Sequence, residues 1–156
     1  MGGSFDIVTL AGDLIPETLP LIRATWPGID LSDWRTFVDS LSTSSGISGP
    51  SGALVLRDQA CCLCGLLAYR FEQDLLEGTV LYVRLFTVAD IANSSHTVKA
   101  LLDGAEARAR ELGCESVWIR LQNGQTGLAS RLRSLGLFSR NDFLLSKKVD
   151  AGRSWN

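Results

Sequence analysis

The chain has 156 residues, of which 46% are hydrophobic and 21% are charged, so it is long enough to bury the core of one globular domain. Its formal net charge of -2 argues against a nucleic-acid partner, because such proteins usually carry a basic surface. No apolar run approaches the roughly 18 residues of a membrane span. The N-terminus also lacks the basic start and apolar core of a signal peptide. We therefore expect one cytoplasmic domain over residues 1–156 without membrane association.

The first part of the chain predicts one strand followed by two helices. Residues 5–11 form the expected strand, and Pro16 suits the first turn of a helix that ends near residue 26. Ser32 can cap a second helix, whose apolar side chains recur at helical spacing at Trp34, Phe37, Val38 and Leu41. Residues 42–52 are rich in serine and glycine, which predicts a surface loop, with a lid over a substrate as the alternative.

The middle of the chain predicts an antiparallel meander and then the most regular helix. Strands are expected over residues 53–56, 60–71 and 79–88, separated by short polar turns. A helix over residues 95–112 stops at Gly113 and has one apolar face, which comprises Val98, Leu101, Leu102, Ala105, Ala109 and Leu112.

The remaining segments add a strand, a short helix and a last strand. A strand is expected over residues 117–121, and a helix marked by three leucines ends at Gly136. The last strand covers residues 143–149, and its two lysines suit a sheet edge. The order β-α-α-β-β-β-α-β-α-β predicts a mixed α/β fold, in which helices cover both faces of a central sheet.

The four cysteines are interpreted as buried, reduced thiols. Cys61, Cys62 and Cys64 fall in the strand expected over residues 60–71, and Cys114 follows the long helix. Cys61 and Cys64 have the spacing of a metal-binding hairpin, but a strand would place them on opposite faces. Since only Cys114 and the single histidine, His96, remain for a second pair of ligands, we predict no metal site.

Residues 86–102 carry the strongest functional signal. The end of an apolar strand is followed by the polar stretch Asp90-Ile-Ala-Asn-Ser-Ser95 and then by the first turn of the long helix. The first backbone N–H groups of a helix have no partner within the helix and point the same way. A helix start of this kind therefore suits an anion such as a phosphate.

Together with the order of elements, this layout resembles the GCN5-related N-acetyltransferase (GNAT) family, over about residues 5–149. The family signature V-x-P-x-x-R-G-x-G-x-G/A-x-x-L-L matches residues 88–102 in length, and its apolar frame is kept by Val88, Leu101 and Leu102. The remaining signature positions differ, with Asp90 at the proline, Asn93 at the arginine, and Ser94, His96 and Val98 at the small residues. The resemblance implies a GNAT-like mixed, mostly antiparallel sheet with helices on both faces.

The resemblance implies that acetyl-CoA binds as a co-substrate along the strand end and over the helix start. The implied contacts come from Phe86, Thr87 and Val88 on the strand, and from Asn93, Ser94, Ser95, His96, Thr97 and Val98 on the loop and helix. In the family, backbone N–H groups and the helix dipole hold most of the pyrophosphate, and these survive a change of side chain. Loss of the arginine removes a contact worth ~1.5–3 kcal/mol, so we expect weak binding.

The resemblance also implies an acceptor pocket near the connection between the first two helices. Trp26 and Trp34 bracket this connection, and they either line the pocket or pack in the core. Alternation along the third strand of the meander places Tyr82, Arg84 and Phe86 on one face. We take Tyr82 and Arg84, together with the two tryptophans, as the expected substrate-binding residues.

No catalytic residue is assigned from the sequence. The position at which the family often carries a proton-donating tyrosine is occupied by Leu132, which has no proton to donate. Either Trp118 or Arg120 is expected to line the cleft where the strands of residues 79–88 and 117–121 separate.

Two functions from different classes follow. The resemblance implies an acyl-CoA-dependent N-acetyltransferase that moves an acetyl group from acetyl-CoA to an amine on a small molecule or a protein. The alternative is a GNAT-fold protein without turnover, which acts as a binding module or forms a homodimer. The altered signature and Leu132 count in favour of this alternative, because a fold does not by itself imply an activity. The transferase is nevertheless the preferred prediction, because a cofactor site built from backbone groups survives a change of side chains.

Overall fold

A seven-stranded sheet forms the centre of the molecule, with its strands in the order β1-β2-β3-β4-β5-β7-β6. The computed structural model describes residues 5–43, 51–89, 95–122, 125–141 and 144–149. Its strands are β1 (Asp6–Thr9), β2 (Ser51–Arg57), β3 (Leu63–Asp74), β4 (Gly78–Val88), β5 (Ser116–Arg120), β6 (Phe138–Asn141) and β7 (Leu144–Lys148). Among these described strands, β4 and β5 are the only parallel neighbours. The mixed, mostly antiparallel sheet predicted from the sequence is confirmed.

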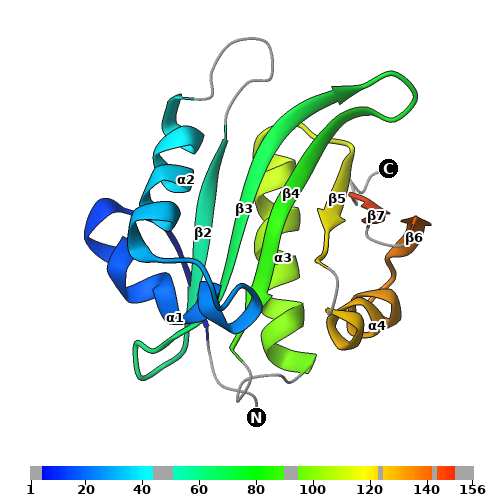
Figure 1. Cartoon of the computed structure of the whole chain (residues 1–156). Coiled ribbons are helices and arrows are strands. Elements are labelled where there is room, and N and C mark those ends of the chain that lie inside the picture. Colours follow the sequence, from blue (N-terminus) through cyan, green and yellow to red (C-terminus); the bar gives the residue numbers. More distant parts are fainter. Residues whose placement is uncertain (1–4, 44–50, 90–94, 123–124, 142–143, 150–156) are drawn as a thin grey trace.

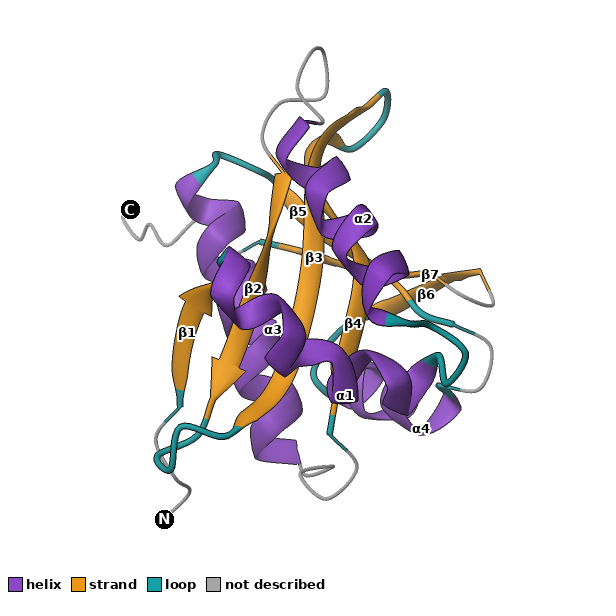
Figure 2. Ribbon diagram, turned by 60° about the vertical axis from the view of Figure 1, so that its left-hand side comes forward, coloured by secondary structure: helices purple, strands orange, loops and turns teal. Residues whose placement is uncertain are grey.

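Helices cover both faces of the sheet, as Figure 1 and Figure 2 show. On one face lie α1 (Ile15–Thr25), which follows a short 3-10 turn over Gly12–Leu14, and α2 (Leu31–Thr43). On the other face lies α3 (Ser95–Glu111), and α4 (Thr126–Ser134) packs against α3 and β7. None of the helices in the described ranges is both long and apolar enough to cross a bilayer.

The start of α2 is set by two aspartates. The backbone N–H of Asp33 donates to Asp30 Oδ1 at 2.8 Å, and the backbone N–H of Asp30 donates to Asp33 Oδ2 at 3.3 Å. This reciprocal arrangement satisfies two N–H groups that the helix itself leaves unpaired. The prediction that Ser32 caps the helix is therefore wrong, because Ser32 already lies inside the first turn.

The core on the α3 side is formed by the residues that helical spacing predicts. Five apolar side chains of α3 are at most 2% exposed, namely Val98, Leu101, Leu102, Ala105 and Ala109. Leu112 lies partly buried just beyond the end of the helix and packs against the same core. The expected placement of this helix across one face of the sheet is confirmed.

The four cysteines divide into two buried and two exposed thiols. Cys64 and Cys114 are buried, and desolvation raises the pKa of each thiol to about 11. Cys61 and Cys62 are exposed, because the turn before β3 is longer than the sequence suggests and β3 begins only at Leu63. The prediction of buried thiols is therefore wrong for this pair. Within the described ranges, no group of three His, Cys, Asp or Glu side chains is placed to hold a metal ion.

The C-terminal part contains a strand that the sequence analysis missed. β6 pairs with β7 in antiparallel fashion and forms the edge of the sheet, so β7 lies between β5 and β6. The two lysines of β7 therefore do not protect an edge. Lys147 pairs with Glu106 of α3 at 2.8 Å, and Lys148 pairs with Glu77 of the β3–β4 turn at 3.5 Å.

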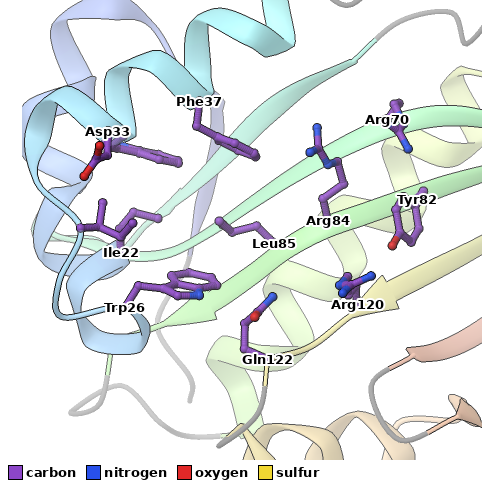
Figure 3. A pocket seen from close by; sticks show the side chains of 12 residues that line it. Ile22, Trp26, Asp33, Phe37, Arg70, Tyr82, Arg84, Leu85, Arg120 and Gln122 are labelled. Carbon is purple, nitrogen blue, oxygen red and sulfur yellow. The ribbon is translucent and has the colours of Figure 1, made fainter.

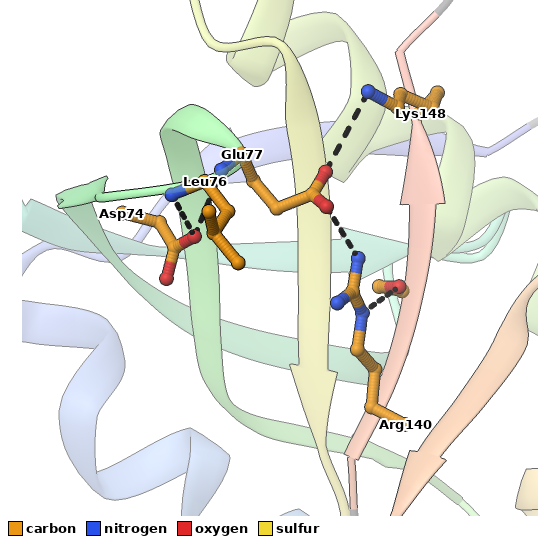
Figure 4. A network of polar contacts seen from close by, with 6 residues as sticks. Asp74, Leu76, Glu77, Arg140 and Lys148 are labelled. Carbon is orange, nitrogen blue, oxygen red and sulfur yellow. Dashed lines mark hydrogen bonds and ion pairs between the residues drawn. The ribbon is translucent and has the colours of Figure 1, made fainter.

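Glu77 connects the β3–β4 turn to the C-terminal strands (Figure 4). Its carboxylate pairs with Arg140 of β6 at 3.1 Å as well as with Lys148. Arg140 Nε donates to Ser146 Oγ at 2.8 Å, and its guanidinium lies 4.9 Å from the centre of the Trp118 ring. The hydrogen bond from Arg140 lowers the pKa of Glu77, and the charge of Lys148 lowers it further.

We expect Glu77→Gln to reduce stability at neutral pH but not in acid. Because the pKa of Glu77 is lower in the folded protein than its ordinary value of 4.5, its stabilising contribution is present above that value. The contribution is lost as the pH falls through the lowered folded pKa. Urea unfolding of the two proteins across this pH range measures the difference. Glu115→Gln removes a nearby exposed carboxylate and serves as the control, and a constant difference for Glu77→Gln at all pH values would contradict the expectation.

Candidate functional site

The candidate site lies where the parallel strands β4 and β5 stop pairing. Their last paired residues are Val83 and Ile119, whereas β4 continues to Val88 (Figure 1). On its other edge, β4 remains paired with β3 as far as Val88. The edge of β4 beyond Val83 is thus left without a strand partner on the β5 side, so its backbone groups there are not paired with another strand.

A β-bulge in β4 changes which side chains face this opening. Ala68 pairs with Leu85 but Tyr69 pairs with Val83, so Arg84 is the extra residue on β4. Arg84 and Leu85 therefore both face the α1–α2 side, and Phe86 faces the α3 side, where it is fully buried. The prediction that Phe86 shares a face with Tyr82 and Arg84 is wrong because the alternation shifts by one residue at the bulge.

A pocket of about 450 Å³ lies between the helices α1 and α2 and the strands β3, β4 and β5 (Figure 3). Its helix side is mostly apolar and is formed by Ile22, Trp26, Ile29, Trp34 and Phe37. Its strand side is mostly polar and is formed by Arg70, Tyr82, Arg84, Arg120 and Gln122. All four expected substrate-binding residues thus line the same cavity, and their binding of a substrate stays a prediction.

Trp34 belongs both to the core and to the pocket. It is 2% exposed, its indole Nε1 donates to Thr18 Oγ1 at 2.8 Å, and the Thr18 hydroxyl donates to the carbonyl of Ile15 at 2.7 Å. Its ring stacks on Phe37, with the ring centres 5.7 Å apart. Because its polar end and its faces are both engaged, Trp34 gives the pocket a rigid aromatic wall.

The polar side of the pocket is basic. Arg70 forms an ion pair with Glu72 and lies 5.8 Å from the centre of the Tyr82 ring. Arg84 lies 5.1 Å from the centre of the Phe37 ring, which holds its guanidinium against the aromatic wall. Of the two residues considered for the cleft, Arg120 lines the pocket, whereas Trp118 lies beneath Arg140.

The expected cofactor-binding residues of β4 are largely enclosed. Phe86 and Thr87 are at most 1% exposed, and Val88 is half-buried against the core. The hydroxyl of Thr87 lies 2.9 Å from that of Thr25, the last residue of α1. This contact joins the strand expected to bind the cofactor to a helix that forms the pocket wall. In this structure neither residue exposes enough surface, of side chain or backbone, to meet a ligand without a movement of the chain that covers it.

Gln125 is a further residue of the opening, and the sequence analysis missed it. Its side-chain Nε2 donates to the carbonyl of Phe86 at 3.0 Å, and its Oε1 accepts the backbone N–H of Gln122 at 2.8 Å. One amide side chain therefore bridges the end of β4 and the segment that follows β5. No periodicity or motif in the sequence indicates this contact, because it depends on how far the two strands separate.

At the start of α3, some side chains face the core and others face solvent. Thr97 and Val98 are buried, so the Val98 side chain points into the core, away from an anion at the helix start. His96 is exposed, and the structure places Ser95 as the first residue of the helix. The expected contacts Asn93 and Ser94 lie outside the described residues. In the described part of this turn, the groups that can bind an anion are the backbone N–H groups.

The catalytic chemistry of the site is sparse. Leu132 lies on the core-facing side of α4 and is fully buried, so this position offers neither a proton nor access to the opening. Among the described pocket-lining residues, Tyr82 carries the only phenol and Asp33 the only carboxylate. These two groups are the candidates for accepting or donating a proton within the pocket.

Comparisons with known proteins identify the fold. No protein-family model and no curated protein matches the sequence. An aminoglycoside N-acetyltransferase, AAC(6')-Iy, in complex with CoA superposes with a TM-score of 0.70 at 14% identity, over 91% of this chain and 97% of that chain. A spermidine N-acetyltransferase from Vibrio cholerae, in complex with CoA and spermine, superposes with a TM-score of 0.70 at 10% identity, over 93% of this chain and 95% of that chain. An acetyltransferase of the GNAT family from Staphylococcus aureus Mu50 superposes with a TM-score of 0.66 at 10% identity, over 94% of this chain and 100% of that chain. The chain therefore has the fold of the GCN5-related N-acetyltransferases.

Proposed function

We propose that this protein is an acyl-CoA-dependent N-acetyltransferase that transfers an acetyl group from acetyl-CoA to an amine. The observation that carries the proposal is the position of the pocket, which opens directly beside the unpaired edge of β4. An extended acyl carrier on that edge would bring its acetyl thioester to an acceptor held in the pocket. The structures of the same fold with CoA bound support the choice of carrier.

The β4 edge suits the pantetheine arm of CoA. This arm is an extended chain with two amide groups, which can pair with backbone N–H and C=O groups as an added strand does. The Gln125 amide occupies part of the opening and bonds to Phe86 and Gln122, so it either moves aside or becomes a contact of the arm. The start of α3 would then receive the pyrophosphate on its backbone N–H groups.

The proposed reaction needs little from side chains if the amine arrives neutral. The amine nitrogen attacks the thioester carbon, the C–N bond forms and the C–S bond breaks. The nitrogen loses one proton, and the departing thiolate of CoA gains one, so the reaction is balanced without a further reactant. Tyr82 and Asp33 are the pocket groups that can exchange these protons.

Thermal unfolding with and without acetyl-CoA tests the cofactor part. At a hundred times its Kd, a ligand stabilises the folded state by about 2.7 kcal/mol, which raises the Tm of a chain of this size by roughly 5–10 °C. Inorganic pyrophosphate serves as the control for simple anion binding. The absence of a shift with millimolar acetyl-CoA would contradict the proposal.

Acetyl transfer itself is best followed by mass spectrometry of the amine product. A thiol reagent would also react with the exposed Cys61 and Cys62, so the release of CoA thiol is a poor measure here. If acetyl-CoA stabilises the protein but no amine is acetylated, the second candidate function is favoured, namely a GNAT-fold module without turnover. The burial of Leu132 is the observation that keeps this candidate open.

A further inference from the structure

The two sides of the pocket differ in chemistry, as Figure 3 shows. Aromatic and aliphatic side chains come from α1, α2 and their connection, and they include Trp26, Trp34 and Phe37. The strand side carries three arginines and the hydroxyl of Tyr82, whereas Asp33 is the only carboxylate among the described lining residues. An occupant of this pocket therefore meets an apolar surface on one side and excess positive charge on the other.

Two of the three arginines have no acidic partner within the described residues. Arg70 is neutralised by its ion pair with Glu72. By contrast, Arg84 and Arg120 form no ion pair with any described carboxylate. Arg84 is half-buried and held over the Phe37 ring at 5.1 Å, so it is positioned without being neutralised. Asp33 is already engaged with the backbone N–H of Asp30 at the start of α2.

This charge distribution selects among amines. A guanidinium stays protonated at every accessible pH and pairs with a carboxylate through two parallel hydrogen bonds. A polycationic acceptor would bring further positive charge beside Arg84 and Arg120, and the repulsion is strongest at Arg84, which is half-buried against the aromatic wall, whereas Arg120 is exposed. The cavity of about 450 Å³ is in the size range of a small-molecule site.

We propose that the acceptor is an amine that also carries a carboxylate and a large apolar side chain, as an aromatic or aliphatic α-amino acid does. Its carboxylate pairs with Arg84, its apolar side chain packs on Trp26 and Phe37, and Arg120 adds positive potential near the opening. This inference rests on the proposed function and specifies its substrate class. This substrate class differs from those of the structurally similar aminoglycoside and spermidine N-acetyltransferases.

A matched set of probes tests the substrate class. L-phenylalanine and phenylethylamine share the ring and a primary amine of similar basicity and differ in the carboxylate, and spermidine represents a polycation. With acetyl-CoA present and at the same low substrate concentration, we expect product to form about tenfold to a hundredfold faster from phenylalanine than from phenylethylamine. Equal or faster acetylation of phenylethylamine or of spermidine would overturn the inference.

Variants assign the preference to the arginines. Arg84→Gln should abolish most of the preference for the carboxylate, Arg120→Gln should reduce it, and Arg84→Lys should restore part of it because the charge is kept. Arg110→Gln, on the exposed face of α3 and away from the pocket, is the matched control and should leave the preference unchanged. Unfolding in urea shows whether each variant is folded, and an unchanged preference in folded Arg84→Gln would overturn the inference.

A binding measurement separates this inference from the proposed function. N-acetyl-L-phenylalanine carries the carboxylate and the ring but no reactive amine, so calorimetry reports on the pocket without any acyl transfer. If it binds in an Arg84-dependent manner and acetyl-CoA neither binds nor reacts, the pocket inference holds and the transferase proposal fails. If acetyl-CoA binds and amines without a carboxylate are acetylated preferentially, the transferase proposal holds and the present inference fails.

Discussion

His96→Glu is expected to weaken the binding of CoA by about tenfold while leaving the protein at least as stable as before. His96 is an exposed residue of the first turn of α3, beside the N–H groups proposed to receive the pyrophosphate. A carboxylate at this point favours the helix by ~0.3–1 kcal/mol, because it complements the positive end of the helix dipole. The same carboxylate repels a bound pyrophosphate, so affinity and stability move in opposite directions. Calorimetric titration with CoA and unfolding in urea measure the two effects.

The control for this variant places the same side chain at the other end of the helix. Arg110→Glu lies in the last turn of α3, where a negative charge opposes the dipole and slightly lowers stability. It should leave the affinity for CoA unchanged, because it is remote from the helix start. Equal CoA affinity for the wild-type protein and His96→Glu would exclude the start of α3 from the cofactor site.

Leu101→Ala is expected to lower the free energy of unfolding by about 2–5 kcal/mol. Leu101 is fully buried, and a Cβ added at Gly65 of β3 would lie 3.3 Å from its Cδ2 atom. The helix therefore packs closely on the sheet at this point, and truncation leaves a cavity that rigid strands on the other side cannot fill. Urea unfolding measures the loss.

Leu75→Ala removes the same side chain from the β3–β4 turn and is the control. Leu75 is 97% exposed, so its truncation should change the stability by less than about 0.5 kcal/mol. Similar losses for the two variants would mean that α3 is not anchored to the sheet through Leu101. That result would also remove the support on which the helix start, and with it the proposed anion site, depends.

The cofactor edge and the acceptor pocket share structural support. Thr25 at the end of α1 and Thr87 of β4 are joined through their hydroxyls at 2.9 Å, and Thr87 also donates to the carbonyl of Leu21 at 3.5 Å. Trp26, which lines the pocket, is the residue directly after Thr25. The wall of the pocket is therefore held at a defined distance from the strand on which the acyl carrier is proposed to lie.

Local patterns in the sequence determined the helices and most of the sheet. The apolar face of α3 is spaced at the helical period and α1 carries its proline in the first turn, so both were predicted close to their observed bounds. The meander β2–β3–β4 was also predicted, because its apolar runs are separated by polar turns. The short, polar segment of β6 has no such pattern, and it forms a strand only because β7 offers it an edge.

The candidate site depended both on patterns within single strands and on contacts between strands. Alternation along β4 correctly placed Tyr82 and Arg84 on one face, since this requires only the period of a strand. Phe86 lies on the opposite face because of the bulge. The bulge arises from the pairing of β4 with β3, and no pattern within the sequence of β4 predicts it. Likewise, the turn that exposes Cys61 and Cys62 is decided by where β3 begins to pair with β2.

The sequence by itself therefore determined the fold class, the long helix whose start is proposed to bind an anion, and the candidate residues of the opening. Only the tertiary structure decided that Arg84 and Arg120 face Trp26 and Phe37 across one pocket, and that Gln125 bridges the strands where they part. The physical reason is that periodicity and capping act between residues close in the chain. Strand register, the point at which β4 and β5 separate, and the charge balance of a cavity arise from contacts between residues that are distant in sequence.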